Sequence, residues 1–76
     1  MHILAVDDEQ AALFLLEEAI QKAVPHAQIH AFILPAQALA YARQNPVDVA
    51  FLDQEMPGMD GMTLGKKLTE LYPDIN

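Results

Sequence analysis

Short apolar runs alternate along the chain with longer segments of helical periodicity. The run Ile3–Val6 stops at an acidic triplet, Asp7–Glu9, and the run Val47–Leu52 ends in the carboxylate of Asp53. Apolar runs of this length, bounded by turn residues, predict strands, and continuous ones favour the buried strands of a parallel sheet. Gln28–Phe32 alternates polar and apolar residues, which predicts a strand at a sheet edge.

Three segments between and after these runs have the spacing of amphipathic helices: Gln10–Val24, Pro35–Gln44 and Gly61–Leu71. Pro25 ends the first segment, and Asp60 can cap the third. The second has Leu34 at its cap position, which is a poor cap, and places Tyr41 toward its outer side. The side chains predicted to face the sheet are Leu13, Leu16, Ile20, Ala23, Ala38, Leu39, Ala42, Leu64, Leu68 and Leu71.

Strand and helix therefore alternate three times within one domain of 76 residues. This alternation predicts an α/β fold with a parallel sheet and helices on both faces. Right-handed crossovers restrict the possible topologies to a few. Ile75 and Asn76 would start a further strand.

Composition narrows the class of protein. The net charge of −7 argues against direct binding of nucleic acid, which requires a basic surface. The absence of cysteine is compatible with a reducing cytoplasm, and no apolar run approaches the length of a membrane-spanning helix. We expect a soluble cytoplasmic protein without membrane contact.

Three carboxylates follow predicted strands. Asp7 and Asp8 end the first strand and Asp53 ends the third, so they would converge if these strands are neighbours. Carboxylates held so close repel one another unless a cation lies among them, and Mg²⁺ prefers such oxygen ligands. A carboxylate beside Mg²⁺ can attack phosphorus and form an aspartyl phosphate. The alternative is a solvated acidic loop that only favours the N-terminus of the following helix.

The motifs decide between these alternatives. Val6–Glu9 after a strand, then Phe51–Asp53 followed by Met56–Gly61, resembles the receiver domain of two-component response regulators. The resemblance runs through all 76 residues at the spacing of that family. The segment Asn45–Tyr72 is most similar to receivers of regulators with a LytTR-type DNA-binding domain.

The resemblance implies a flavodoxin-like (CheY-like) fold of three α/β/α layers, with the three strands in the order 2-1-3. It implies that Asp53 accepts a phosphoryl group from a histidine kinase, without the chain being an enzyme. Asp7, Asp8 and Asp53 would bind Mg²⁺ together with the backbone carbonyl of Glu55. The phosphoryl group would control an output domain, expected to bind DNA, elsewhere in a longer protein.

Receivers of this family are about half as long again. We therefore expect residues 1–76 to be the N-terminal portion, without the fourth and fifth strands and their Ser or Thr and Lys. The third strand would then be an exposed apolar edge, which is an association hazard. We expect a homodimer that covers it by strand pairing or by swapping of elements.

Two other interpretations stay open. The chain could be a structural or association fragment that is not phosphorylated. It could also be a Mg²⁺-dependent phosphatase with an aspartyl nucleophile, although those enzymes usually show Asp-x-Asp after the first strand. His2, His26 and His30 share no spacing with one another, and we expect them to be surface residues and not ligands.

Overall fold

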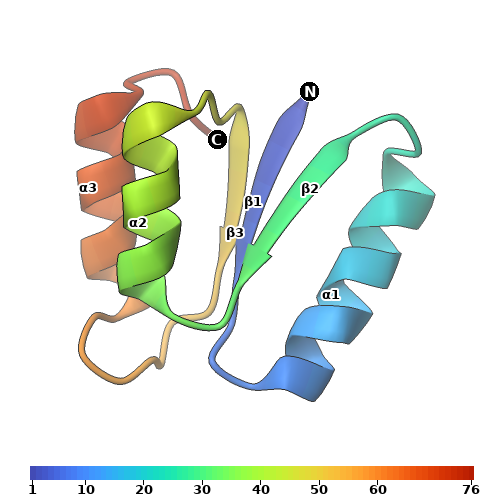
Figure 1. Ribbon diagram of the computed structural model, residues 1–76, viewed down its shortest axis with the longest axis horizontal. Coiled ribbons are helices and arrows are strands. Elements are labelled where there is room, and N and C mark those ends of the chain that lie inside the picture. The colour runs from blue at the N-terminus through green and yellow to red at the C-terminus, as the bar shows by residue number, and fades with distance from the viewer.

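Strands and helices alternate strictly in the computed structural model, which describes residues 1–76 (Figure 1). The elements are β1 (His2–Val6), α1 (Gln10–Ala23), β2 (Gln28–Phe32), α2 (Pro35–Gln44), β3 (Val49–Leu52) and α3 (Gly61–Leu71). None of the three helices combines the length and the hydrophobicity that crossing a bilayer requires.

The three strands form one parallel sheet in the order β2-β1-β3. Ile3 lies opposite both Ile29 of β2 and Val49 of β3. Because β1 is in the middle, its residues 3–6 are at most 1% exposed. The order 2-1-3 and the edge position of β2, both expected from the sequence, are confirmed.

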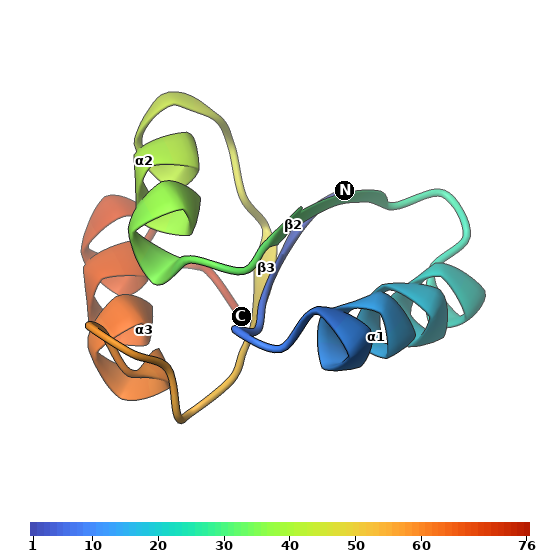
Figure 2. The ribbon, with the colours of Figure 1, turned by 60° about the horizontal axis from the view of Figure 1, so that its bottom comes forward.

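Helices cover both faces of the sheet, α1 on one and α2 with α3 on the other (Figure 2). Successive side chains of β1 point to opposite faces, as in any strand. Leu4 and Val6 therefore pack in the core beneath α2 and α3, while Ile3 and Ala5 pack in a smaller core beneath α1. The three-layer α/β/α architecture is that of the flavodoxin-like fold.

The helix boundaries follow from their terminal residues. The side chain of Asp60 accepts a hydrogen bond of 2.7 Å from the backbone N–H of Thr63, so it caps α3 as expected. Leu34 makes no such bond before α2. α1 ends one residue earlier than predicted, at Ala23, and the N–H of Val24 bonds to the Ile20 carbonyl at 2.8 Å.

The third strand is shorter and less buried than the run Val47–Leu52 predicted. β3 begins at Val49, and Val47 is a buried loop residue at 5% exposure. Phe51 is 42% exposed. Its exposure follows from the layer arrangement, because α1 packs against β1 and β2 and does not contact β3.

Three single side chains also differ from expectation. Ala23 and Leu71 are exposed, since each lies in the last turn of its helix, beyond the helix's buried residues. Tyr41, expected on the outer side of α2, is half-buried, and its ring centroid lies 5.5 Å from that of Phe32.

The outer edge of β3 is partly paired. The N–H of Asn76 donates to the Asp48 carbonyl at 3.3 Å, and the Asn76 carbonyl accepts from the N–H of Ala50 at 2.8 Å. These two bonds have the pattern of a parallel ladder with Asn76 beside Val49. Asn76 therefore runs parallel to β3, as expected of a strand that starts at Ile75–Asn76. The unpaired edge of β3 is shorter than expected.

Candidate functional site

The carboxyl ends of β1 and β3 are held side by side by backbone hydrogen bonds. The N–H of Asp53 donates to the Val6 carbonyl at 2.9 Å, and the N–H of Asp7 donates to the Phe32 carbonyl of β2 at 3.2 Å. Both acidic residues therefore leave the sheet at the same edge. In open α/β sheets, ligands bind at this edge.

Asp7, Asp8 and Asp53 form the site. Each offers a carboxylate oxygen, and these oxygens all lie within 4.8 Å of one another. Asp7 and Asp53 are half-buried, whereas Asp8 is exposed. The Oδ1 atom of Asp7 also accepts a hydrogen bond of 3.0 Å from the N–H of Glu9, which fixes the orientation of that carboxylate.

This donor set suits a hard divalent cation. Three carboxylates provide oxygen ligands and negative charge, and the exposure of Asp8 leaves access for the water molecules that Mg²⁺ retains. The site contains no histidine or cysteine, so a softer metal has no advantage there. The residues present therefore fit Mg²⁺.

The loop after Asp53 is shaped by one buried side chain and one glycine. Met56 is 8% exposed and packs in the larger core. Gly58 has φ of 82°, a left-handed conformation that other residues rarely adopt. Glu55 lies exposed in this loop, two residues after Asp53. Its backbone carbonyl as a metal ligand stays a prediction.

Gly61 supports the site from behind and was not singled out by the sequence patterns. A Cβ atom at this position would overlap the Asp53 carbonyl oxygen and would lie 3.1 Å from the Cα atom of Gln54. The N–H of Gly61 donates to the Gln54 carbonyl at 3.3 Å. The first turn of α3 therefore packs directly on the backbone that carries Asp53. The sequence signals were its place at the end of the motif Met56–Gly61 and at the first position of a capped helix.

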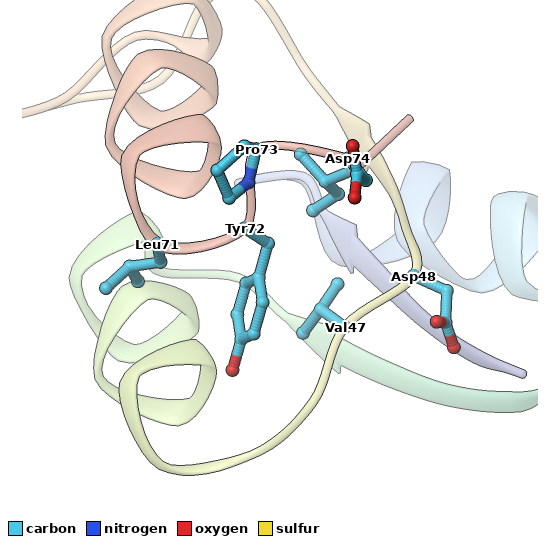
Figure 3. Close-up of a pocket in the computed structure, with 7 residues that line it drawn as sticks. Val47, Asp48, Leu71, Tyr72, Pro73 and Asp74 are labelled. Atoms are coloured by element: carbon cyan, nitrogen blue, oxygen red, sulfur yellow. The ribbon is translucent and has the colours of Figure 1, made fainter.

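A hollow of about 260 Å³ lies away from the acidic site, at the other end of β3 (Figure 3). Val47 and Asp48, which precede β3, and Tyr72, Pro73 and Asp74, which follow α3, line it. None of the three clustered carboxylates lies on its wall. This hollow is therefore separate from the acidic site.

Comparisons with known proteins agree with this geometry. The family described as response regulator receiver domain matches residues 3–76. The cyclic di-GMP phosphodiesterase response regulator RpfG of Xanthomonas campestris pv. campestris is 34% identical over 71 residues, which are 93% of this chain and 19% of RpfG. Response regulator GtcR of Aneurinibacillus migulanus is 40% identical over 70 residues, 92% of this chain and 28% of GtcR.

A similar solved structure is that of response regulator protein TrrA from Thermotoga maritima in complex with Mg²⁺-BeF. It has a TM-score of 0.87 and 29% identity, and the match covers 99% of this chain and 64% of TrrA. TrrA has also been solved in complex with histidine kinase ThkA, with a TM-score of 0.84 to this chain. The chain thus spans less than a third of the two curated relatives and about two thirds of TrrA.

Proposed function

The chain belongs to the response regulator receiver domain family, and from this premise we propose that Asp53 accepts a phosphoryl group from a histidine kinase. The observation that carries the proposal is the convergence of Asp7, Asp8 and Asp53 at the carboxyl edge of the sheet. TrrA, 29% identical, has been solved both with Mg²⁺-BeF and with a histidine kinase. These two complexes support the partner and the cofactor.

Asp53 is the nucleophile in this proposal. One of its carboxylate oxygens forms a bond to phosphorus while the phosphorus–nitrogen bond of the kinase phosphohistidine breaks, and the electron pair stays on the imidazole nitrogen. The signal ends by hydrolysis: a water oxygen attacks phosphorus, the bond to Asp53 breaks, and inorganic phosphate leaves. The hydrogen bond from the backbone N–H of Asp53 to the Val6 carbonyl keeps the nucleophile in place throughout.

Asp7, Asp8 and Asp53 would hold Mg²⁺, with the Glu55 backbone carbonyl as a fourth protein ligand. The bound ion supplies positive charge for the oxygens of the transferring phosphoryl group. Asp8, as the exposed member, offers its carboxylate from the solvent side, and Asp7 offers the oxygen that its bond to Glu9 leaves free. The aspartates themselves bind and orient, and Asp53 alone changes its covalent state.

The test is the intact mass of the chain after incubation with acetyl phosphate and Mg²⁺. We expect a single phosphoryl adduct that is absent after chelation of Mg²⁺ and absent in Asp53→Asn. Glu55→Gln is the matched control, because it changes a neighbouring carboxylate but leaves the backbone carbonyl, and it should be phosphorylated normally. An adduct that persists in Asp53→Asn would overturn the assignment. Bound Mg²⁺ without any adduct would favour an association fragment.

The activity of the whole protein is a wider proposal, because the chain covers at most 28% of the two curated relatives. We propose that phosphorylation controls a DNA-binding output domain, with a LytTR-type domain as the first candidate. This receiver segment does not itself bind DNA in the proposal, since its net charge is −7.

We also propose that two copies associate through the outer side of β3. The exposed ring of Phe51, on a part of the sheet that α1 leaves uncovered, favours this proposal. Asn76 of the same chain already pairs with Asp48 and Ala50 at this edge, which supports the proposal that the rest of the edge can pair with a further strand.

A further inference from the structure

Two of the three histidines, expected to be unrelated, lie in contact on the sheet. His2 of β1 is opposite Gln28 of β2, so His30 lies two residues further along the same face. The Nδ1 atom of His2 is 3.2 Å from the Nε2 atom of His30. The ring planes differ by 17° and the ring centroids are 5.4 Å apart. The sequence analysis did not predict this contact, because register between strands, and not sequence spacing, brings the two rings together.

Tyr41 of α2 holds the second ring of the pair. Its hydroxyl oxygen is 3.1 Å from the Nδ1 atom of His30, and the two ring centroids are 4.7 Å apart. When His30 donates its Nδ1 proton to this oxygen, the lone pair of its Nε2 atom is directed at His2. This is the arrangement of metal-binding histidines, whose second ring nitrogen is fixed by an outer partner.

The surroundings favour a cation between the rings. Burial lowers the pKa of His30, and the neighbouring His2 lowers this pKa further, which favours the neutral ring that binds metal. The Asp48 carboxylate accepts a hydrogen bond of 2.7 Å from the N–H of His2, which places negative charge at the start of β1. The chain as a whole carries a net charge of −7, which attracts cations. Both imidazole rings are half-buried and therefore accessible from solvent on one side.

We propose that His2 Nδ1 and His30 Nε2 bind one transition-metal ion of the Zn²⁺ or Cu²⁺ class, with water molecules as the remaining ligands. Two nitrogens on a tetrahedral zinc ion are about 3.3 Å apart, because each bond is about 2.0–2.1 Å long. The separation of 3.2 Å already present meets this requirement. A rotation of the two rings turns both lone pairs toward a common ion, and the proton of His2 moves from Nδ1 to Nε2, so the neutral pair releases no net proton.

This site is distinct from the acidic one in place and in chemistry. His2 begins β1, whereas Asp7 follows its last residue. Imidazole nitrogens select zinc, copper or nickel, and carboxylates with water select magnesium. Bound metal would join β1 to β2 and, through Tyr41, to α2. It would stabilise the folded chain, since the unfolded chain does not hold the two rings together. The inference does not depend on phosphorylation of Asp53.

The test is calorimetric titration of the whole chain with Zn²⁺, in excess Mg²⁺ that occupies the carboxylates. We expect one zinc ion per chain and a melting temperature that rises with zinc concentration. Both effects should disappear in His2→Asn and in His30→Asn. Tyr41→Phe removes only the outer partner and should weaken zinc binding by about tenfold.

His26→Asn is the matched control, because His26 is exposed in the turn between α1 and β2 and contacts neither His2 nor His30 in the site. It should bind zinc as the unchanged chain does. Circular dichroism without metal shows whether each variant is folded. If His30→Asn does not fold, the test rests on His2→Asn. Equal zinc binding by the unchanged chain, His2→Asn and His26→Asn would overturn the proposal, as would the absence of zinc binding by the unchanged chain.

Discussion

Single residues decide how accurately Asp53, the proposed nucleophile, is placed, and Gly61 is the clearest example. Its missing side chain lets the first turn of α3 rest on the carbonyl of Asp53. Gly65, one turn further along the same helix, is a different case. A Cβ atom there would meet only the Leu52 Cδ1 atom, at the ordinary contact distance of 3.6 Å. The site therefore requires the absence of a side chain at Gly61, whereas the helix tolerates a Cβ atom at Gly65.

We predict opposite effects for alanine at these two positions. Gly61→Ala forces the backbone of Asp53 to move, with a destabilisation of about 1–3 kcal/mol. A misplacement of about 1 Å typically costs roughly 100-fold in rate, so phosphorylation by acetyl phosphate should be much slower. Gly65→Ala should stabilise the fold by about 0.5–1 kcal/mol and leave phosphorylation unchanged. Urea unfolding and the rate of adduct formation measure both effects, and normal phosphorylation of folded Gly61→Ala would contradict the prediction.

Asp60 makes the stability of α3 dependent on pH. The hydrogen bond from the Thr63 backbone N–H lowers the pKa of this carboxyl group below its usual 3.8. Because the folded pKa is lower than the unfolded one, the stabilisation is complete above about pH 3.8 and is lost as the pH falls through the folded value. Asp60→Ala should therefore melt a few degrees lower at pH 7, and this difference should shrink toward pH 3.

Asp60→Asn tests the cause of that pH dependence. Asparagine keeps an oxygen that accepts from Thr63 but does not ionise, and it is about as good a cap as aspartate. The melting difference between Asp60→Asn and Asp60→Ala should stay constant between pH 7 and pH 3. A difference between the unchanged chain and Asp60→Ala that does not vary with pH would show that the ionised form is not what stabilises the helix.

At the scale of the elements, apolar periodicity was sufficient to predict the features that the local sequence sets. The bounds of β2, α2 and α3 match the predicted ones because Pro35, Asp60 and the residues before Pro73 set them through local backbone chemistry. Periodicity could not show which strand edges lack a covering helix, and so it misjudged Phe51. The acidic site was predictable because parallel strands share a carboxyl edge. The contact of His2 with His30 was not, since it depends on the register of two strands.

Tyr72 joins two helices at their C-terminal ends. Its hydroxyl oxygen lies 2.7 Å from the carbonyl of Ala42 and 2.6 Å from that of Asn45, so the two carbonyls share its single proton. Tyr72→Phe keeps the ring but leaves both carbonyls without this donor. We predict a loss of about 1 kcal/mol in the free energy of unfolding, or about 4–8 °C in melting temperature. Urea and thermal unfolding measure it, and an unchanged midpoint would mean that water replaces the hydroxyl.

At the scale of the whole molecule, the proposed association of two copies would use the side of β3 that α1 leaves uncovered. Phe51 is 42% exposed there. If this surface joins two copies, Phe51→Thr should shift the chain toward monomer in sedimentation velocity at micromolar concentration, because threonine keeps strand propensity but removes the apolar ring. Phe14→Thr, which changes an exposed phenylalanine of α1, is the control and should sediment as the unchanged chain does. A compact monomer for the unchanged chain would end the dimer proposal.

The central place of β1 has a consequence for how the chain acquires its fold. Among the three strands, β1 is translated before both of its partners, and its pairing with β3 joins residues such as Ile3 and Val49, which are 46 positions apart. The side of β1 that pairs with β3 stays without a partner on the ribosome until β3 has emerged. Long-range pairing of this kind slows folding and exposes the nascent chain to aggregation. We therefore expect the time spent before β3 is synthesised, more than final stability, to set the demand of this protein for chaperones.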